Sequence, residues 1–112
     1  GVCSILLDGR VIKSCLLMAP KVNGSSILTI EGLSHNGELH PVQQAFKDNF
    51  ALQCGYCTPG FIMATVDYIS SSPSNPPIRD EIKTAIKGNV CRCTGYEKII
   101  SAVSSAIVSS EN

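Results

Sequence analysis

Apolar positions alternate in short runs over the first third of the chain. Residues 4–7 and 10–12 flank the pair Asp8-Gly9, which predicts a β-hairpin within residues 2–15. Residues 26–30 form another apolar run and predict a further strand. Because three short strands make a poor sheet on their own, this part is interpreted as the remnant of a larger β unit.

Helical spacing of apolar residues begins at Pro41, since proline suits the first position of a helix. This first helix is expected to place four side chains on one apolar face: Val42, Ala45, Phe46 and Phe50. A second helix is expected to start with Thr58 as its N-cap and Pro59 as its first residue, and to run to about Ser71.

Two more helices are predicted towards the C-terminus. The third covers about residues 78–87, with acidic residues early and lysines late, as the helix dipole favours. The fourth begins with Thr94 and Glu97 as a capping box and continues through Ile107. Four helices with short connections predict a bundle, so the expected fold class is α+β.

Four of the six cysteines lie in a sequence motif that occurs twice. Cys54-Gly55-Tyr56-Cys57 is followed by Thr58-Pro59-Gly60-Phe61, and Cys91-Arg92-Cys93 is followed by Thr94-Gly95-Tyr96. Each phrase leads into a predicted helix, so two loops with two thiols each are expected at helix starts, where backbone N–H groups favour anions. The repeat suggests two helix pairs related by a pseudo-twofold axis.

Four thiolates can hold either an iron–sulfur cluster or a structural zinc ion. The single residue between Cys91 and Cys93 is less typical of a zinc knuckle, and two thiol pairs suit a two-iron cluster, in which each iron takes two thiolates. Iron–sulfur is therefore favoured over zinc, and disulfides come third. His35 and His40 are interpreted as capping or surface residues rather than metal ligands.

Composition narrows the classes of partner. The chain has 112 residues with 9 basic and 9 acidic side chains, and no basic stripe that would indicate a nucleic-acid partner. Six cysteines in this length would suggest disulfides in a secreted protein. The C-x-C and C-x2-C spacings suit a shared metal better, so a reducing compartment, the cytoplasm, is expected.

Two motifs resemble the signature of the iron–sulfur subunit of molybdenum hydroxylases, the xanthine dehydrogenase, aldehyde oxidoreductase and aerobic carbon monoxide dehydrogenase family. These motifs are residues 53–60, Gln-Cys-Gly-Tyr-Cys-Thr-Pro-Gly, and residues 88–96, Gly-Asn-Val-Cys-Arg-Cys-Thr-Gly-Tyr. Residues 29–33 and 40–46 fit the same pattern. The resemblance implies a four-helix bundle, residues 41–112, that holds one [2Fe-2S] cluster on Cys54, Cys57, Cys91 and Cys93.

The resemblance also implies that residues 1–33 are the remnant of a plant-ferredoxin-like (β-grasp) domain, joined to the bundle by a connector at residues 34–40. Cys3 and Cys15 then correspond to two ligands of a second [2Fe-2S] cluster. Its other two ligands would lie ahead of Gly1, so the chain is expected to be truncated at its N-terminus and the second site to be incomplete here.

The family resemblance implies an electron-transfer subunit with no substrate-transforming residues of its own. Electrons would come from a molybdenum–pterin centre in a large partner subunit and leave towards FAD in a medium subunit or another acceptor. Gln53 would contact the pterin. A structural zinc module and a stand-alone ferredoxin are the alternatives. The zero net charge favours a permanent subunit over a free shuttle, which would usually carry a charged docking face.

Overall fold

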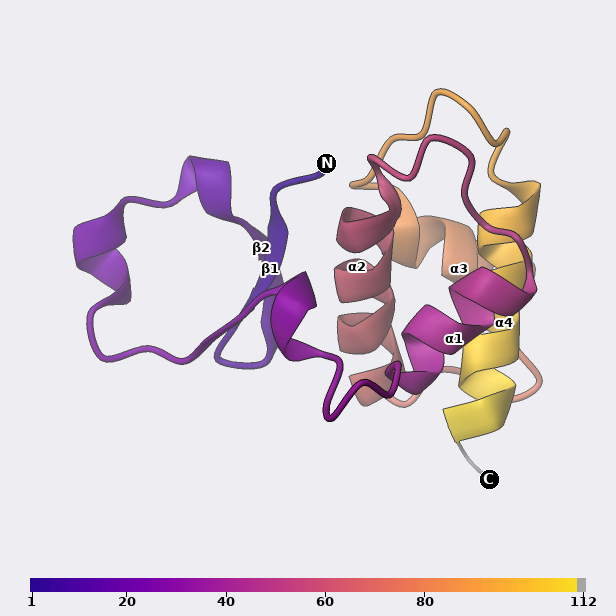
Figure 1. Ribbon diagram of the computed structural model, residues 1–112, viewed down its shortest axis with the longest axis horizontal. Coiled ribbons are helices and arrows are strands. Elements are labelled where there is room, and N and C mark those ends of the chain that lie inside the picture. Colours follow the sequence, from indigo (N-terminus) through magenta and orange to yellow (C-terminus); the bar gives the residue numbers. More distant parts are fainter. Residues whose placement is uncertain (111–112) are drawn as a thin grey trace.

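A small antiparallel sheet with its loops lies beside a group of four helices in the computed structural model, which describes residues 1–110 (Figure 1). The helices are α1 (Pro41–Asp48), α2 (Thr58–Ser70), α3 (Arg79–Ile86) and α4 (Glu97–Ser110). Short 3₁₀ helices at Ser14–Leu16, Ala19–Val22 and Ile30–Gly32 occupy the segments around the sheet. No helix in this described part combines the length and hydropathy of a membrane-spanning segment.

The predicted hairpin is present. Strand β1 (Ser4–Leu7) pairs antiparallel with β2 (Arg10–Lys13), and the turn residues Asp8 and Gly9 have φ values of 48° and 82°. Positive φ at both central residues is what a type I′ turn requires. Strand β3 (Ile27–Leu28) pairs with the other edge of β1, so the sheet has the order β2-β1-β3.

Helix α2 is the centre of the fold. It packs against β1 on one side and against α1, α3 and α4 on the other. Residues 60–65 are all buried, and Phe61 and Met63 have 0% exposure. A helix that is apolar on every side must be covered on every side. The other helices cover it with fully buried side chains: Phe46, Ile82, Ile99, Val103 and Ile107.

An ion pair joins the sheet to α2. The Nε atom of Arg10 lies 3.2 Å from Oδ1 of Asp67, whose residue is only 8% exposed. A buried carboxylate is costly without a counter-charge, so Arg10 stabilises the contact between β2 and α2.

His40 caps α1, as the sequence suggested. Its Nδ1 accepts a hydrogen bond of 3.2 Å from the backbone N–H of Val42, and the backbone N–H of His40 donates to Oε1 of Gln43 at 2.9 Å. These two bonds satisfy backbone groups that the first turn of a helix leaves free.

Three predicted details are wrong. The first helix ends at Asp48, and Phe50, which was expected on its apolar face, has φ 52° and is 73% exposed. Thr58 is the first residue of α2, and Cys57 holds the N-cap position. Helix α4 begins at Glu97 rather than after Thr94, and the Tyr96 carbonyl accepts its first backbone bond. The Thr94 hydroxyl instead donates a hydrogen bond to the Cys91 sulfur.

Candidate metal centre

Two cysteine-bearing loops meet at one end of the helices. Residues 51–57 lead into α2, and residues 87–96 connect α3 to α4. Figure 1 shows both loops above the same ends of α2 and α4, with the N-terminus nearby. The positive φ values of Gly55 (82°) and Gly95 (66°) allow the turns within the two loops.

The four predicted ligand cysteines form two pairs, and each pair joins the two loops. The thiols of Cys57 and Cys91 lie near enough to shift one another's pKa, and the Cys54 thiol is the main cause of the raised pKa of Cys93. Cys54 also interacts electrostatically with Cys57, so the two pairs are neighbours. All four thiols are free of disulfides.

This donor set suits two iron atoms. Each iron of a [2Fe-2S] cluster takes two protein thiolates, and the site offers two thiol pairs side by side. No three His, Cys, Asp or Glu side chains in residues 1–110 converge on a single metal position. The buried Thr58 Oγ1, beside Cys57, has no hydrogen-bond partner within this part of the chain. A cluster on these cysteines therefore fits the chemistry of the residues present.

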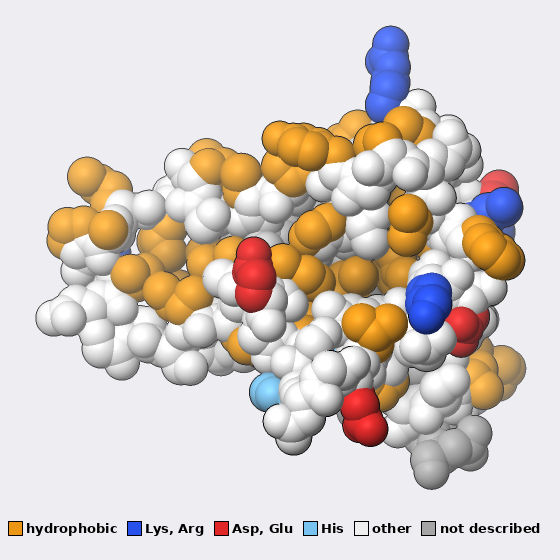
Figure 2. Space-filling model, in the orientation of Figure 1, with side chains coloured by type: hydrophobic (Ala, Val, Ile, Leu, Met, Phe, Trp, Pro, Cys, Tyr) orange, Lys and Arg blue, Asp and Glu red, His pale blue; other side chains and the backbone are white. Residues whose placement is uncertain are grey.

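The site has a buried side and an open side. Cys91 is 8% exposed and Cys57 is half-buried, whereas Cys54 and Cys93 are exposed. Large exposed apolar side chains flank the cysteines along the two loops: Leu52, Tyr56 and Val90. Figure 2 shows hydrophobic side chains gathered at this end of the molecule. Exposed apolar groups around a site often mark a surface that meets another protein.

Burial and hydrogen bonding set the acidity of the inner pair in opposite directions. Burial, followed by the hydrogen bond to Cys91, raises the pKa of the Cys57 thiol to about 11. Burial also opposes ionisation of Cys91, but hydrogen bonds from the hydroxyl and N–H of Thr94, from Cys93 and from Cys57 outweigh it. They lower the pKa of the Cys91 thiol to about 7, because they favour its charged form.

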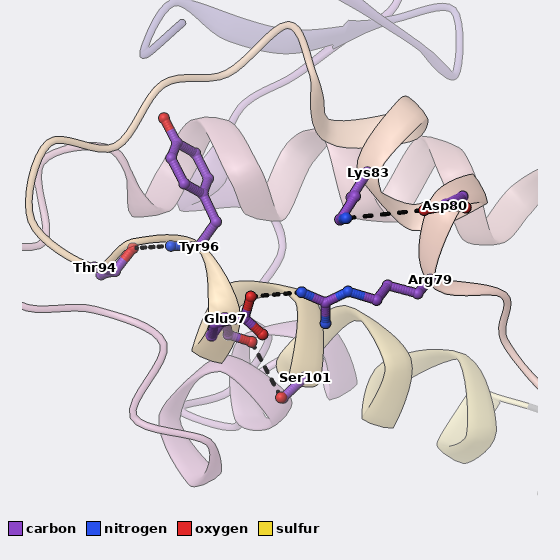
Figure 3. Close-up of polar contacts among 7 residues, drawn as sticks. All are labelled: Arg79, Asp80, Lys83, Thr94, Tyr96, Glu97 and Ser101. Atoms are coloured by element: carbon purple, nitrogen blue, oxygen red, sulfur yellow. Dashed lines mark hydrogen bonds and ion pairs between the residues drawn. The ribbon is translucent and has the colours of Figure 1, made fainter.

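Thr94 and Tyr96 hold the second loop around Cys91. The Thr94 hydroxyl donates to the Cys91 sulfur at 3.1 Å, and its N–H donates to the same sulfur at 3.3 Å. The Tyr96 hydroxyl accepts from the Cys91 N–H at 3.0 Å. The Tyr96 N–H donates to Thr94 Oγ1 at 3.2 Å, as Figure 3 shows. The Tyr96 ring meets the buried Phe61 ring edge-on, with centroids 6.2 Å apart. The loop is thus anchored to α2.

Asn89 fixes the same loop to the N-terminal segment, a role that the sequence did not indicate. Its buried side-chain amide donates to the Gly1 carbonyl at 2.6 Å and to the Ser4 hydroxyl at 3.2 Å. Lys13 donates to Asn89 Oδ1 at 3.4 Å. The only hint in the sequence is the position of this asparagine inside the second cysteine motif.

The remaining predicted site residues are Cys3, Cys15 and Gln53. Cys3 precedes β1, and its carbonyl accepts a bond of 3.0 Å from the N–H of Ser14, next to Cys15. The hairpin therefore brings the backbone at Cys3 and Cys15 close together. Gln53 is exposed, directly before Cys54. Their ligand and pterin roles stay predictions.

Comparison with known proteins gives consistent matches. A family model described as a [2Fe-2S] binding domain matches residues 29–104. The nicotine 6-hydroxylase small subunit of Paenarthrobacter nicotinovorans is 48% identical over 103 residues, which are 92% of this chain and 61% of that protein. The xanthine dehydrogenase iron–sulfur-binding subunit of Escherichia coli O157:H7 is 45% identical over 92% of this chain and 65% of its own length.

Solved structures agree in fold. Quinoline 2-oxidoreductase from Pseudomonas putida 86 matches 98% of this chain and 68% of its own chain, with a TM-score of 0.87 and 41% identity. Aldehyde oxidoreductase from Desulfovibrio gigas matches 100% of this chain and 13% of its own, with a TM-score of 0.86 and 34% identity. The chain thus spans about three fifths to two thirds of the two curated relatives above. It belongs to the [2Fe-2S] binding domain family, in the form found in iron–sulfur subunits of molybdenum hydroxylases.

Proposed function

We propose that Cys54, Cys57, Cys91 and Cys93 hold one [2Fe-2S] cluster. The pairing of the thiols across the two loops carries this proposal, because it supplies two sulfur donors for each of two irons. When bound, such a cluster accepts and gives up one electron at a time. The residues around it exclude water on the Cys91 side and donate hydrogen bonds to sulfur.

On this basis the chain acts as the electron-transfer subunit of a molybdenum-containing hydroxylase or dehydrogenase. It would take electrons from a molybdenum–pterin centre in a large partner subunit and pass them towards FAD in a medium subunit or another acceptor. The names of the relatives support the oxidoreductase class. The exposed apolar side chains beside the cysteines support a permanent protein contact there. The cytoplasm is the proposed compartment.

Gln53 is the proposed contact to the molybdenum cofactor's pterin. Its exposed side chain directly precedes Cys54, one of the two exposed thiols, so it lies on the open side of the site. A polar amide at this boundary would orient the pterin with respect to the cluster without ligating either.

We extend the proposal to the N-terminal part. Residues 1–33 correspond to part of a plant-ferredoxin-like domain, residues 34–40 to a connector and residues 41–112 to a four-helix cluster-binding bundle. Within the described residues, Cys3 and Cys15 lie at neighbouring ends of the hairpin strands. Such neighbours suit two of the ligands of a second [2Fe-2S] cluster.

The test is metal analysis of the 112-residue chain purified without oxygen. Iron and acid-labile sulfide should each be about two per chain. Stoichiometric zinc without sulfide would instead support the structural zinc module, and would refute the proposal. In the reconstituted complex, Gln53→Ala should slow reduction of the cluster by substrate while the iron content stays unchanged. Gln44→Ala on α1 is the matched control, and a wild-type rate in Gln53→Ala would remove Gln53 from the relay.

A further inference from the structure

The Cys91 sulfur accepts hydrogen bonds from its own loop. Two of them come from one residue, Thr94, through its hydroxyl at 3.1 Å and its N–H at 3.3 Å. The N–H is available whatever side chain stands at position 94. The hydroxyl belongs to the threonine side chain, so a substitution at position 94 can remove it.

A second contact occupies an acceptor site of the Thr94 hydroxyl oxygen. Thr94 Oγ1 accepts a hydrogen bond of 3.2 Å from the Tyr96 N–H (Figure 3). A hydroxyl has a single proton, and the 3.1 Å contact shows that Thr94 can donate this proton to the Cys91 sulfur while its oxygen accepts the Tyr96 N–H. Tyr96 is itself held by its contacts with Cys91 and Phe61, so the arrangement is rigid.

Burial strengthens the hydrogen bond from the Thr94 hydroxyl to the Cys91 sulfur. Cys91 is 8% exposed and Thr94 is half-buried, so water competes little for the sulfur. Electrostatic contributions are stronger in such an environment than at a wet surface. Neither exposed cysteine, Cys54 or Cys93, accepts a hydrogen bond from a side-chain hydroxyl within residues 1–110.

We propose that Thr94 is a positioning residue that raises the reduction potential of the cluster through its hydroxyl bond to the Cys91 sulfur. This inference rests on the cluster assignment above. Reduction adds one negative charge to the cluster and its sulfur ligands. A hydrogen bond to a ligand sulfur stabilises the more negative state, so it makes the cluster easier to reduce.

The experiment is a spectroelectrochemical titration of the iron-loaded protein. Thr94→Val removes the hydroxyl and keeps the shape of the side chain, whereas Thr94→Ser keeps the hydroxyl. The equilibrium constant for reduction should fall about tenfold in Thr94→Val, which equals about 59 mV for a one-electron couple. Thr94→Ser should stay near the wild type. Thr84→Val, an exposed threonine on α3, controls for threonine-to-valine changes elsewhere.

Two further measurements keep the proposal open to refutation. Thr94→Ala removes the hydroxyl with a smaller side chain and should shift the potential in the same direction if valine is not tolerated. Pulsed magnetic resonance of the reduced wild type should detect an exchangeable proton coupled to the cluster that Thr94→Ala lacks. If the cluster is intact and its reduction potential is unchanged in both Thr94→Val and Thr94→Ala, this inference alone is overturned. A wild-type chain without iron and sulfide would overturn the proposed function, and this inference with it.

Discussion

The side-chain amide of Asn89 donates a 2.6 Å hydrogen bond to the backbone carbonyl of Gly1, a residue 88 positions away in the sequence. Asn89 stands two residues before Cys91, and Gly1 stands two residues before Cys3. This bond therefore ties the cysteine loop between α3 and α4 to the segment that enters β1. It makes the sheet and the helices one structural unit at the end where the cysteines lie.

Asn89→Ala should loosen this junction. The substitution removes one hydrogen bond from the Gly1 carbonyl and one from the Lys13 ammonium, although both groups keep a bond to Ser4, so it should cost about 1 kcal/mol of unfolding free energy. Denaturant unfolding measures the loss, and hydrogen exchange should show faster exchange in the first strand. Asn23→Ala, at an exposed position, is the control. Equal stability of the two variants would show that the junction is held by apolar packing alone.

Gly60→Ala should disturb the same junction from the side of α2. A Cβ atom at this position would clash with the Gly1 carbonyl oxygen and lie 2.6 Å from Asn89 Nδ2. Overpacking of this kind typically costs about 1–3 kcal/mol, which exceeds the gain in helix propensity of about 1 kcal/mol.

Gly88→Ala is the matched control for Gly60→Ala, because its Cβ would lie 3.7 Å from the Lys13 ammonium, an ordinary contact. Thermal unfolding of the two variants gives the comparison. A melting temperature of Gly60→Ala equal to that of the control would contradict the close approach of α2 to the N-terminal segment.

Stability should fall in mild acid because of His40. Burial, with a smaller contribution from His35, lowers the pKa of His40 below its ordinary value. Its neutral Nδ1 accepts the Val42 N–H, and protonation destroys that acceptor. The contribution is therefore complete above the unfolded-state pKa of about 6.5 and is lost as the pH falls through the lower folded-state pKa.

Unfolding free energy measured as a function of pH tests the His40 prediction. His40→Asn keeps a capping side chain that does not titrate, so its profile should be flatter than that of the wild type in this range. Identical profiles would mean that other groups cause the acid sensitivity.

Cys57→Ser or Cys91→Ser should lower the stability of the iron-loaded protein by more than the loss of a single iron–sulfur bond would. The two loops that carry these cysteines are far apart in sequence, so binding energy at the site is also folding energy. A loss of at least about 2 kcal/mol, or roughly 10 °C in melting temperature, is expected together with lower helical circular dichroism. Thr84→Ser, at an exposed position on α3, is the control. An unchanged melting curve without bound iron would show that the apolar core alone holds the helices.

Local signals in the sequence were sufficient for some elements and insufficient for others. The hairpin at Asp8-Gly9 and the helix start at Pro41 are confirmed, because each depends on backbone preferences of a few adjacent residues. Phe50 was misplaced, because the chain leaves the helix at Asn49 although the apolar spacing continues.

The details of the site depend on contacts that the sequence does not contain. Threonine is a residue type that often caps helices. The Thr94 hydroxyl instead donates to the Cys91 sulfur, which the loop brings close. The thiol pairs of the motifs are neighbours in sequence, whereas the contacts in the structure run between loops. Asn89 could not be singled out because its partner, Gly1, is at the opposite end of the chain.

The crossing of the two thiol pairs between loops has a consequence for biosynthesis. Each pair takes one cysteine from residues 54–57 and one from residues 91–93, with α2 and α3 between them in sequence. While the ribosome is still extending the chain towards residue 91, neither pair is complete. Iron delivered to the nascent chain at that stage would find sulfur donors from one loop only. Loading of the proposed [2Fe-2S] cluster would therefore follow translation of the second loop, which carries Cys91 and Cys93.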